Sequence, residues 1–219
     1  MSGPIPFDYK PEVPKLAQPG QFDQSLYSFS VTEPTGDVGE FKDALKNAMN
    51  DLWNNFIEDE SSSEWTLGRE ENGVKIYTKP SSTNGILIAK GVGIINESPE
   101  LLRAVFTSHK AKKMYDKDVD DSSLLQRIDT NTTILYATFK APWPVSWRDA
   151  VVISRTVMLQ DGSIFHYIAN AIHKDKPEIS GYVRAKLLHS GFLLQPIENG
   201  KKTKVTYVSA TDPAGYLPT

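Results

Sequence analysis

Two prolines and two tryptophans stand close together in the stretch Ala141-Pro142-Trp143-Pro144-Val145-Ser146-Trp147-Arg148-Asp149. The segments on either side are rich in β-branched and aromatic residues and predict a long β-hairpin. Proline donates no backbone hydrogen bond to a sheet, so Pro142 and Pro144 push the connection out of the sheet as a loop. Trp143 is left at the tip, where its amphipathic ring either packs beneath the loop, as Trp147 also could, or meets a membrane interface.

Outward from this hairpin the sequence predicts an α+β fold dominated by an antiparallel sheet. Apolar residues at three- and four-residue steps predict a helix over residues 37–59. Asn72-Gly73 predicts a tight turn between two short strands, and Ser98-Pro99-Glu100 predicts a second helix start. About nine strands are expected, at residues 65–67, 74–77, 86–95, 122–129, 131–140, 148–160, 163–173, 181–194 and 202–210.

The chain divides into an extension and a folded domain. Residues 1–36 hold six of the 14 prolines and show no helical or strand period. Such a composition is typical of an extended or disordered segment. We therefore expect a proline-rich extension at 1–36 and one domain at 37–219.

Composition excludes several classes of function. The 24 basic and 27 acidic side chains give a net charge of -3, which provides no broad electrostatic surface for nucleic acid. There are no cysteines, so no disulfide scaffold, cysteine nucleophile or thiolate metal site is available. No segment has the length and apolarity of a membrane span, and we expect a soluble cytoplasmic protein.

The residues offer no catalytic or cofactor motif. The four histidines lack metal-ligand spacing, and no nucleophile-elbow pattern occurs. Gly91-Val92-Gly93 lies within a predicted strand and lacks the third glycine of a phosphate-binding turn. We therefore expect no enzyme activity, no metal and no cofactor.

Strand alternation selects candidate interior residues. Leu135, Ala137 and Phe139 share one face of their strand and are expected to point inward. Arg155 falls among apolar residues of the next strand, so either a bulge returns it to water or it anchors an anionic group. Asn170 shares a face with apolar residues and is either a core hydrogen bonder or a ligand contact.

Several motifs in one order resemble the START lipid-transfer domain over residues 37–219. The segments that carry the resemblance are residues 71–77, the pair Tyr115-Asp116, the stretch 142–149, Val183-Arg184-Ala185, and residues 212–218. The resemblance implies a helix-grip fold, in which a curved antiparallel sheet encloses a tunnel for one lipid. It also implies a non-enzymatic carrier that moves an amphipathic lipid between membranes and touches them transiently.

The resemblance also bears on ligand class. Lys112 stands where many members of the family have an arginine for head groups, and Asp116 matches an acid used by ceramide-type members. Ala137 stands where those members have a glutamine, and Arg155 departs by one position from the sterol-type arginine. Because the inward charges available are cationic, a glycerophospholipid is favoured over sterol or ceramide. A lipid-sensing or partner-binding module that acts through residues 1–36 stays an alternative, while a cyclase-like enzyme on the same scaffold would need a buried acid-base pair.

The sequence departs from the family pattern at its C-terminus. The family continues from this point into a helix that forms one wall of the tunnel, whereas the sequence ends at Thr219. Either the sequence is a piece of a longer protein, or the 1–36 extension or a second copy closes the groove. Trp143 matches a tryptophan that some members insert into the bilayer, which favours a membrane-gate role for the loop with Trp143 and Trp147.

Overall fold

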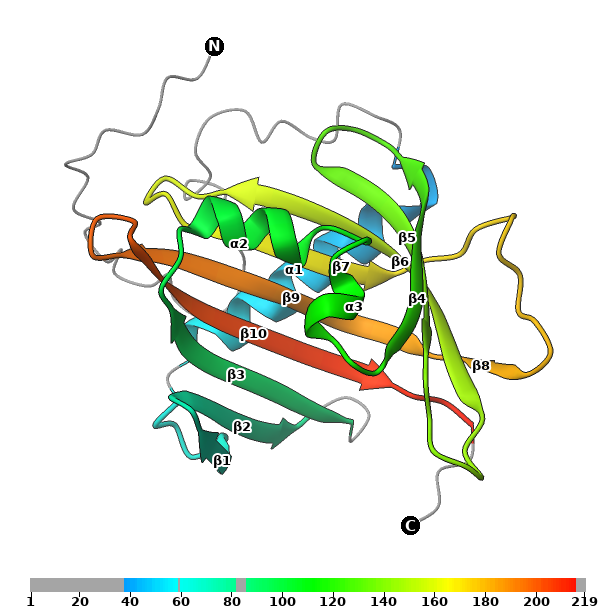
Figure 1. The fold of residues 1–219 in the computed structure, drawn as a ribbon, viewed down its shortest axis with the longest axis horizontal. Helices are drawn as coiled ribbons and strands as arrows, with labels where there is room; N and C mark the ends of the chain where they lie inside the picture. The colour runs from blue at the N-terminus through cyan, green and yellow to red at the C-terminus, as the bar shows by residue number, and fades with distance from the viewer. Residues whose placement is uncertain (1–37, 59, 82–85, 216–219) are drawn as a thin grey trace.

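A computed structural model describes residues 38–58, 60–81 and 86–215 (Figure 1). The extension at 1–36 and its predicted boundary therefore lie outside the described residues. The elements in chain order are a 3₁₀ turn at Gly39–Phe41, α1 (Lys42–Ile57), β1 (Thr66–Glu71), β2 (Val74–Pro80), β3 (Leu87–Ile95), α2 (Pro99–Phe106), α3 (Lys112–Tyr115), β4 (Val119–Arg127), β5 (Thr132–Phe139), β6 (Trp147–Met158), β7 (Ile164–Asn170), β8 (Tyr182–Arg184), β9 (Lys186–Ile197) and β10 (Lys202–Asp212).

The strands form one sheet in the order β1-β2-β3-β10-β9-β7-β6-β5-β4, with β8 attached to β6 outside this path. Every pair along the path is antiparallel, and only the short β6–β8 pair is parallel. In Figure 1 the long strands cross the molecule as a twisted, curved layer, with α1 behind it and α2 and α3 in front. The predicted α+β class and the antiparallel sheet are confirmed.

Local signals account for the turn and helix start that the sequence predicts. Asn72 and Gly73 both have positive φ, 52° and 76°, which suits the tight β1–β2 hairpin. The Ser98 hydroxyl accepts a hydrogen bond from the Leu101 N–H at 3.3 Å, and Pro99 opens α2.

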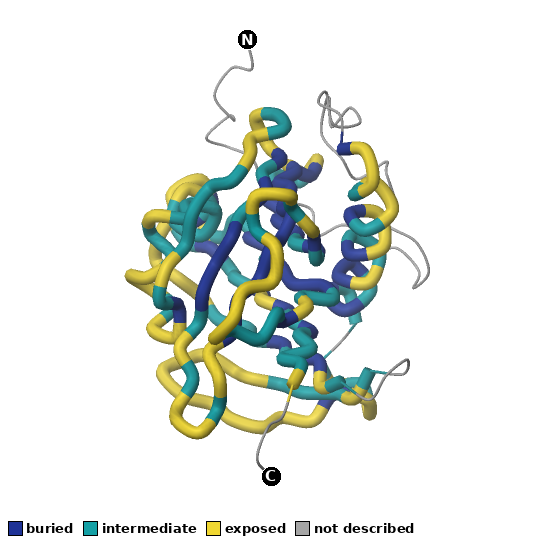
Figure 2. The backbone as a smooth tube through the Cα atoms, turned by 90° about the vertical axis from the view of Figure 1, so that its right-hand side faces the viewer, coloured by how far each residue is buried: buried dark blue, intermediate teal, exposed yellow. Residues whose placement is uncertain are grey.

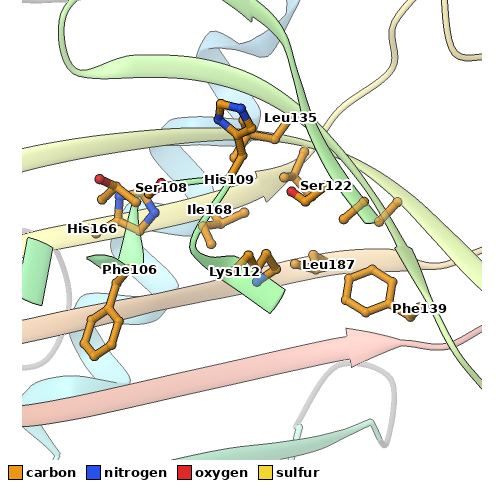
Figure 3. Close-up of a pocket in the computed structure, with 14 residues that line it drawn as sticks. Phe106, Ser108, His109, Lys112, Ser122, Leu135, Phe139, His166, Ile168 and Leu187 are labelled. Atoms are coloured by element: carbon orange, nitrogen blue, oxygen red, sulfur yellow. The ribbon is translucent and has the colours of Figure 1, made fainter. Parts of the chain in front are cut away.

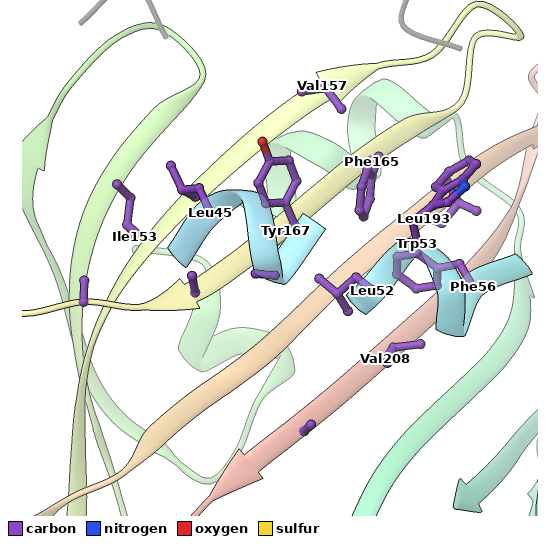
Figure 4. Close-up of a cluster of buried hydrophobic side chains, with 14 of the residues drawn as sticks. Leu45, Leu52, Trp53, Phe56, Ile153, Val157, Phe165, Tyr167, Leu193 and Val208 are labelled. Carbon is purple, nitrogen blue, oxygen red and sulfur yellow. The ribbon is translucent and has the colours of Figure 1, made fainter. Parts of the chain in front are cut away.

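The main core lies between α1 and one face of the sheet (Figure 4). Helix α1 buries one side because its apolar residues recur at three- and four-residue steps. These side chains meet aromatic and β-branched residues of β6, β7, β9 and β10; the cluster includes Leu45, Leu52, Trp53, Phe56, Ile153, Val157, Phe165, Tyr167, Leu193 and Val208. The rings of Phe56 and Phe165 pack in a T-shaped arrangement at a centroid distance of 5.5 Å.

A buried lysine fixes the end of α1 to the sheet. The side chain of Lys90 in β3 is 0% exposed, and its Nζ donates to the backbone oxygen of Glu58 at 2.8 Å. The same Nζ lies 2.8 Å from Glu60 Oε1 and 5.2 Å from the centre of the Trp65 ring. Burial lowers the pKa of Lys90, while the carboxylate of Glu60 opposes that shift.

The opposite face of the sheet carries α2 and α3. Leu102 of α2 packs with Ile164 and Leu194, which alternate with the residues that face α1. Figure 2 shows the buried residues gathered in the central strands and along one side of α1, with exposed loops at the rim. No helix among the described residues is long and apolar enough to cross a membrane.

The predicted strand at 181–194 was wrong in one respect, because the structure divides it into β8 and β9. Residues 182–184 pair in parallel with the start of β6, and the Ala185 N–H donates to the backbone oxygen of Asp149 at 2.8 Å. After Ala185 the chain continues directly as β9, which pairs with β7 and β10. Within residues 38–58, 60–81 and 86–215, β10 is the last element, and no helix follows it.

Candidate functional site

A pocket lies on the face of the sheet opposite α1, beneath the connection between α2 and α3 (Figure 3). It holds about 530 Å³ of empty space, part of which is open to solvent. Its wall on the sheet side is mainly apolar and consists of Leu135, Ala137, Phe139, Ala150, Val152, Ile168 and Leu187. Its other lining residues are Phe106, Ser122, His166 and the α2–α3 segment residues Thr107, Ser108, His109 and Lys112. The pocket is therefore amphipathic.

Strand register assembles the apolar wall. Leu135 pairs with Val152 and Ala137 with Ala150, and paired residues point to the same face of a sheet. The predicted inward set of Leu135, Ala137 and Phe139 thus lies together in the pocket.

Lys112 brings the positive charge that the sequence predicts to this pocket. Its Nζ lies 3.8 Å from Asp116 Oδ2, one helical turn away, and 5.8 Å from the centre of the Tyr115 ring. Burial lowers the pKa of Lys112, and the nearby Asp116 carboxylate opposes that shift. Asp116 does not line the pocket itself and lies beside it as the ion-pair partner of Lys112.

His166 of β7 is a pocket residue that was absent from the predicted site. The residue is 5% exposed, and its Nδ1 shares a hydrogen bond of 2.9 Å with Thr156 Oγ1. Burial, followed by the positive charges of Lys112 and Arg103, lowers the pKa of His166 to about 4. The signal that could have found it is alternation, because His166 and Ile168 share one face of β7 with Asn170.

Two polar atoms on this face of the sheet have no partner among the described residues. Ser122 Oγ in the pocket and Asn170 Oδ1 are both buried without a hydrogen bond. Asn170 pairs with Val152 in the ladder and so points to the pocket side, although it does not line the pocket. Buried polar atoms without partners are uncommon and suit hydrogen bonds to a ligand.

Arg155 is placed elsewhere, which corrects the expectation that it either returns to water or anchors an anionic group of the ligand. It is 5% exposed, and its Nη1 lies 3.1 Å from Asp129 Oδ2 and also donates to Thr132 Oγ1. Its ladder partner Thr132 alternates with the residues of β5 that line the pocket. Burial opposes ionisation of Asp129, but the Asn131 N–H, Thr132 and Arg155 together hold the pKa of Asp129 below its ordinary value.

The loop at 140–146 projects from the sheet beside the end of β10 (Figure 1). Trp143 is 92% exposed at this loop, whereas Trp147 packs its ring edge-on against Tyr182 at 6.2 Å. Arg148 ties the loop to the C-terminal segment: Nε donates to the Pro213 oxygen at 3.2 Å, and Nη2 donates to the Ala214 oxygen at 3.1 Å. Neither tryptophan lines the pocket.

A buried ion pair holds β8 beside this loop. Arg184 Nε donates to Asp149 Oδ1 at 2.7 Å and Nη2 to Asp149 Oδ2 at 2.9 Å, so the pair is bidentate. The Tyr136 hydroxyl also donates to Asp149 Oδ2, at 3.1 Å. The hydrogen bond and charge of Asp149 raise the pKa of Arg184, and burial together with the same carboxylate raises the pKa of Tyr136 to about 12.

Comparison with known proteins identifies the family that carries this arrangement. The START domain model matches residues 47–219. The chain belongs to the START domain family. The fold predicted from the START resemblance is thereby confirmed.

Relatives of this START domain include two bovine proteins. StAR-related lipid transfer protein 5 of Bos taurus is 29% identical over 164 residues, which cover 71% of this chain and 76% of that protein. Phosphatidylcholine transfer protein of Bos taurus is 27% identical over 163 residues, which cover 72% and 75%. The solved structure of human StAR-related lipid transfer protein 5 superposes with a TM-score of 0.71 at 22% identity and covers 78% of this chain and 81% of that one, which shows the shared fold.

Proposed function

We propose that this START domain binds one amphipathic lipid in the pocket and carries it between membranes, with a glycerophospholipid as the favoured ligand. The observation that carries the proposal is the division of the pocket into an apolar wall on the sheet and polar groups at 107–112 and His166. Burying acyl chains gains about 0.8 kcal/mol per methylene, so an apolar wall supplies most of the binding free energy. The half-buried cation of Lys112 suits a phosphate-bearing head group.

Membrane contact belongs to the same proposal. A tryptophan that is 92% exposed at a loop tip has the amphipathic ring that membrane interfaces favour. The protein would act at cytoplasmic membrane surfaces as a peripheral carrier without catalysis. The names of the relatives, which include phosphatidylcholine and ceramide transfer proteins, support lipid transfer as the function. They do not select one lipid.

A ceramide-type ligand is the second candidate, because Asn170 Oδ1 is buried on the pocket side of the sheet without a partner. An amide N–H or hydroxyl of a sphingolipid could donate to this oxygen. Asp116, close to the pocket through Lys112, fits the same head group.

The test is native mass spectrometry of the purified protein, followed by extraction and identification of any bound lipid. We expect one lipid per chain, with a glycerophospholipid supporting the favoured ligand and a ceramide the second candidate. Ala137→Phe places a large ring in the pocket and is expected to abolish binding and transfer between liposomes. Ala104→Phe on the exposed side of α2 is the control. Binding that survives Ala137→Phe with an intact fold would overturn the proposal.

A further inference from the structure

Two groups from different elements meet at the polar side of the pocket: Lys112 from α3 and His166 from β7. We propose that they recognise an anionic group of the bound lipid together, and that binding of this anion is coupled to uptake of one proton by His166. The inference rests on the proposed function, because it names the charge class of the lipid that the pocket takes. It adds a pH-dependent affinity that the apolar wall alone would not produce.

The side chain of His166 is held in a fixed orientation in the pocket lining. His166 is buried, and Thr156 occupies its Nδ1, which fixes the ring and leaves Nε2 for a group in the pocket. The ring of Phe192 stacks near it at a centroid distance of 6.5 Å and closes that side with an apolar surface. In Figure 3, His166 and Lys112 approach the same space from β7 and α3.

The charges around His166 are all of one sign. The charged groups that act on it are Lys112 of α3 and Arg103 of α2, while β6 contributes the neutral Thr156 and β9 contributes Phe192. The α2–α3 segment adds a second titratable ring, His109, to the lining of the same pocket. Asp116 lies beside Lys112 and does not act directly on His166. The empty pocket therefore keeps His166 neutral and presents a positive field, which is complementary to an anion.

The neighbouring aromatic rings disfavour a quaternary ammonium head group. The ring centroids of Phe106 and Phe192 are 4.7 Å apart, as are those of Phe192 and Tyr207. Rings this close are packed against each other and leave no gap for a methylated cation between them. The positive charge of Lys112 would repel such a group as well. A net-negative lipid thus fits this pocket better than a zwitterionic one.

The sign of the coupling follows from linkage. In the empty protein the pKa of His166 is about 4, so the ring is neutral at pH 5–8. A bound anion stabilises the imidazolium and raises this pKa in the complex. The affinity then increases as the pH falls from the pKa of the complex toward 4, by at most about tenfold per pH unit for one proton. Below the pKa of the empty protein the gain stops.

The experiment uses soluble short-chain lipids whose charge is constant between pH 5 and 8. Dihexanoyl phosphatidylglycerol is the anionic probe, dihexanoyl phosphatidylcholine the zwitterionic probe and dihexanoylglycerol the probe without phosphate; inorganic sulfate tests whether a free anion suffices. Affinities are measured by calorimetry below the micellar concentration. We expect phosphatidylglycerol to bind about tenfold more tightly than phosphatidylcholine at pH 5.5 and to weaken as the pH rises. Sulfate that binds as tightly as phosphatidylglycerol would assign the site to a free anion and overturn the lipid assignment.

Matched variants assign the effect to the two residues. His166→Asn should remove the pH slope, while His189→Asn should retain it, because His189 is a buried histidine beside Asp51 of α1 on the other face of the sheet. Lys112→Met should weaken the affinity for phosphatidylglycerol about tenfold, since it removes one charge-assisted contact. The affinity for dihexanoylglycerol should stay unchanged. Lys113→Met, which alters an exposed neighbour, should change neither affinity.

A nuclear magnetic resonance titration of the His166 ring in the unmodified protein tests the same coupling without any substitution. The pKa of His166 should rise when phosphatidylglycerol binds and stay unchanged with dihexanoylglycerol. Equal affinity for the anionic and zwitterionic lipids, or a pKa that does not move, overturns the inference while lipid binding stands. If none of the three short-chain lipids binds, the proposed lipid-binding function itself fails.

Discussion

At the scale of single residues, the pair Asp149–Arg184 illustrates how a charge is placed inside this protein. The carboxylate side chain is 1% exposed and the guanidinium side chain 12%. Two hydrogen bonds from Arg184 and one from Tyr136 satisfy the carboxylate oxygens. Removing one partner of such a pair costs far more than the net value of the pair, because a buried charge is left uncompensated.

We predict that Arg184→Met lowers the free energy of unfolding by about 3–5 kcal/mol, since Asp149 keeps its burial and loses its counter-charge. Urea denaturation followed by circular dichroism measures the change. Arg69→Met is the matched control, because Arg69 and Glu71 form an exposed pair whose loss should cost at most about 0.5 kcal/mol. Equal losses in the two variants would show that Asp149 finds another partner.

Alternation along a strand predicted which residues of β5 face the pocket, but it misplaced Arg155 of β6. The difference lies in how many faces of each strand are buried. Only one parity of β5 lines the pocket, and alternation placed Leu135, Ala137 and Phe139 together. Strand β6 is buried on both faces from Arg148 to Val157, with one parity in the α1 core and the other on the pocket side. Alternation cannot tell two buried faces apart. Arg155 was accordingly expected near the ligand, whereas it pairs with Asp129.

At the scale of elements, the close approach of β9, β7 and α1 depends on a glycine. A Cβ added at Gly191 would lie 2.2 Å from the His166 oxygen and 3.1 Å from Leu52 Cδ1. The first of these atoms belongs to the backbone of β7 and cannot rotate away. Gly91 on β3 is the opposite case, since nothing lies within 4 Å of an added Cβ there.

Gly191→Ala is therefore expected to destabilise the protein by at least about 1–3 kcal/mol, the usual cost of overpacking, because β7 or α1 must shift. Thermal unfolding measured by calorimetry reports the loss. Gly91→Ala adds the same methyl group to open space, and its melting temperature should stay close to that of the parent protein. The explanation by close packing would be contradicted if both alanines were tolerated equally.

Local signals predicted most elements and missed β8. Helix α2 and the β1–β2 turn were found because their capping and turn residues lie within a few positions of each other. Strand β8 has three residues, and its partner Trp147–Asp149 lies far away in sequence. Pairing of this kind leaves no period to detect, so residues 181–194 were predicted as one strand.

At the scale of the whole molecule, the pocket and the 140–146 loop serve different steps of the proposed function. In the proposed function the pocket holds the lipid, while the loop lies beside the C-terminal segment through Arg148 and exposes Trp143 to solvent. The sequence predicts the two sets separately, with Trp143 and Trp147 at the membrane and other residues around the lipid. The structure separates them, because neither Trp143 nor Trp147 lines the pocket.

We predict that Trp143→Ala weakens association with liposomes severalfold and slows transfer, while lipid affinity in solution and thermal stability stay unchanged. Liposome flotation and a fluorescence transfer assay measure the two effects. Met114→Ala removes another apolar side chain, 86% exposed on α3, and is the control for a general loss of exposed apolar surface. An equal effect of the two variants would remove the specific role of the loop.

The lysine beneath the end of α1 offers a way to observe the parting of helix and sheet. Because Lys90 is fully covered and its amine is engaged by Glu58 and Glu60, an acylating reagent can reach it only when that contact opens. Exposed amines such as Lys113 react without any such opening. In a lysine-footprinting experiment, the labelling rate of Lys90 relative to that of Lys113 thus measures how often the end of α1 separates from the sheet.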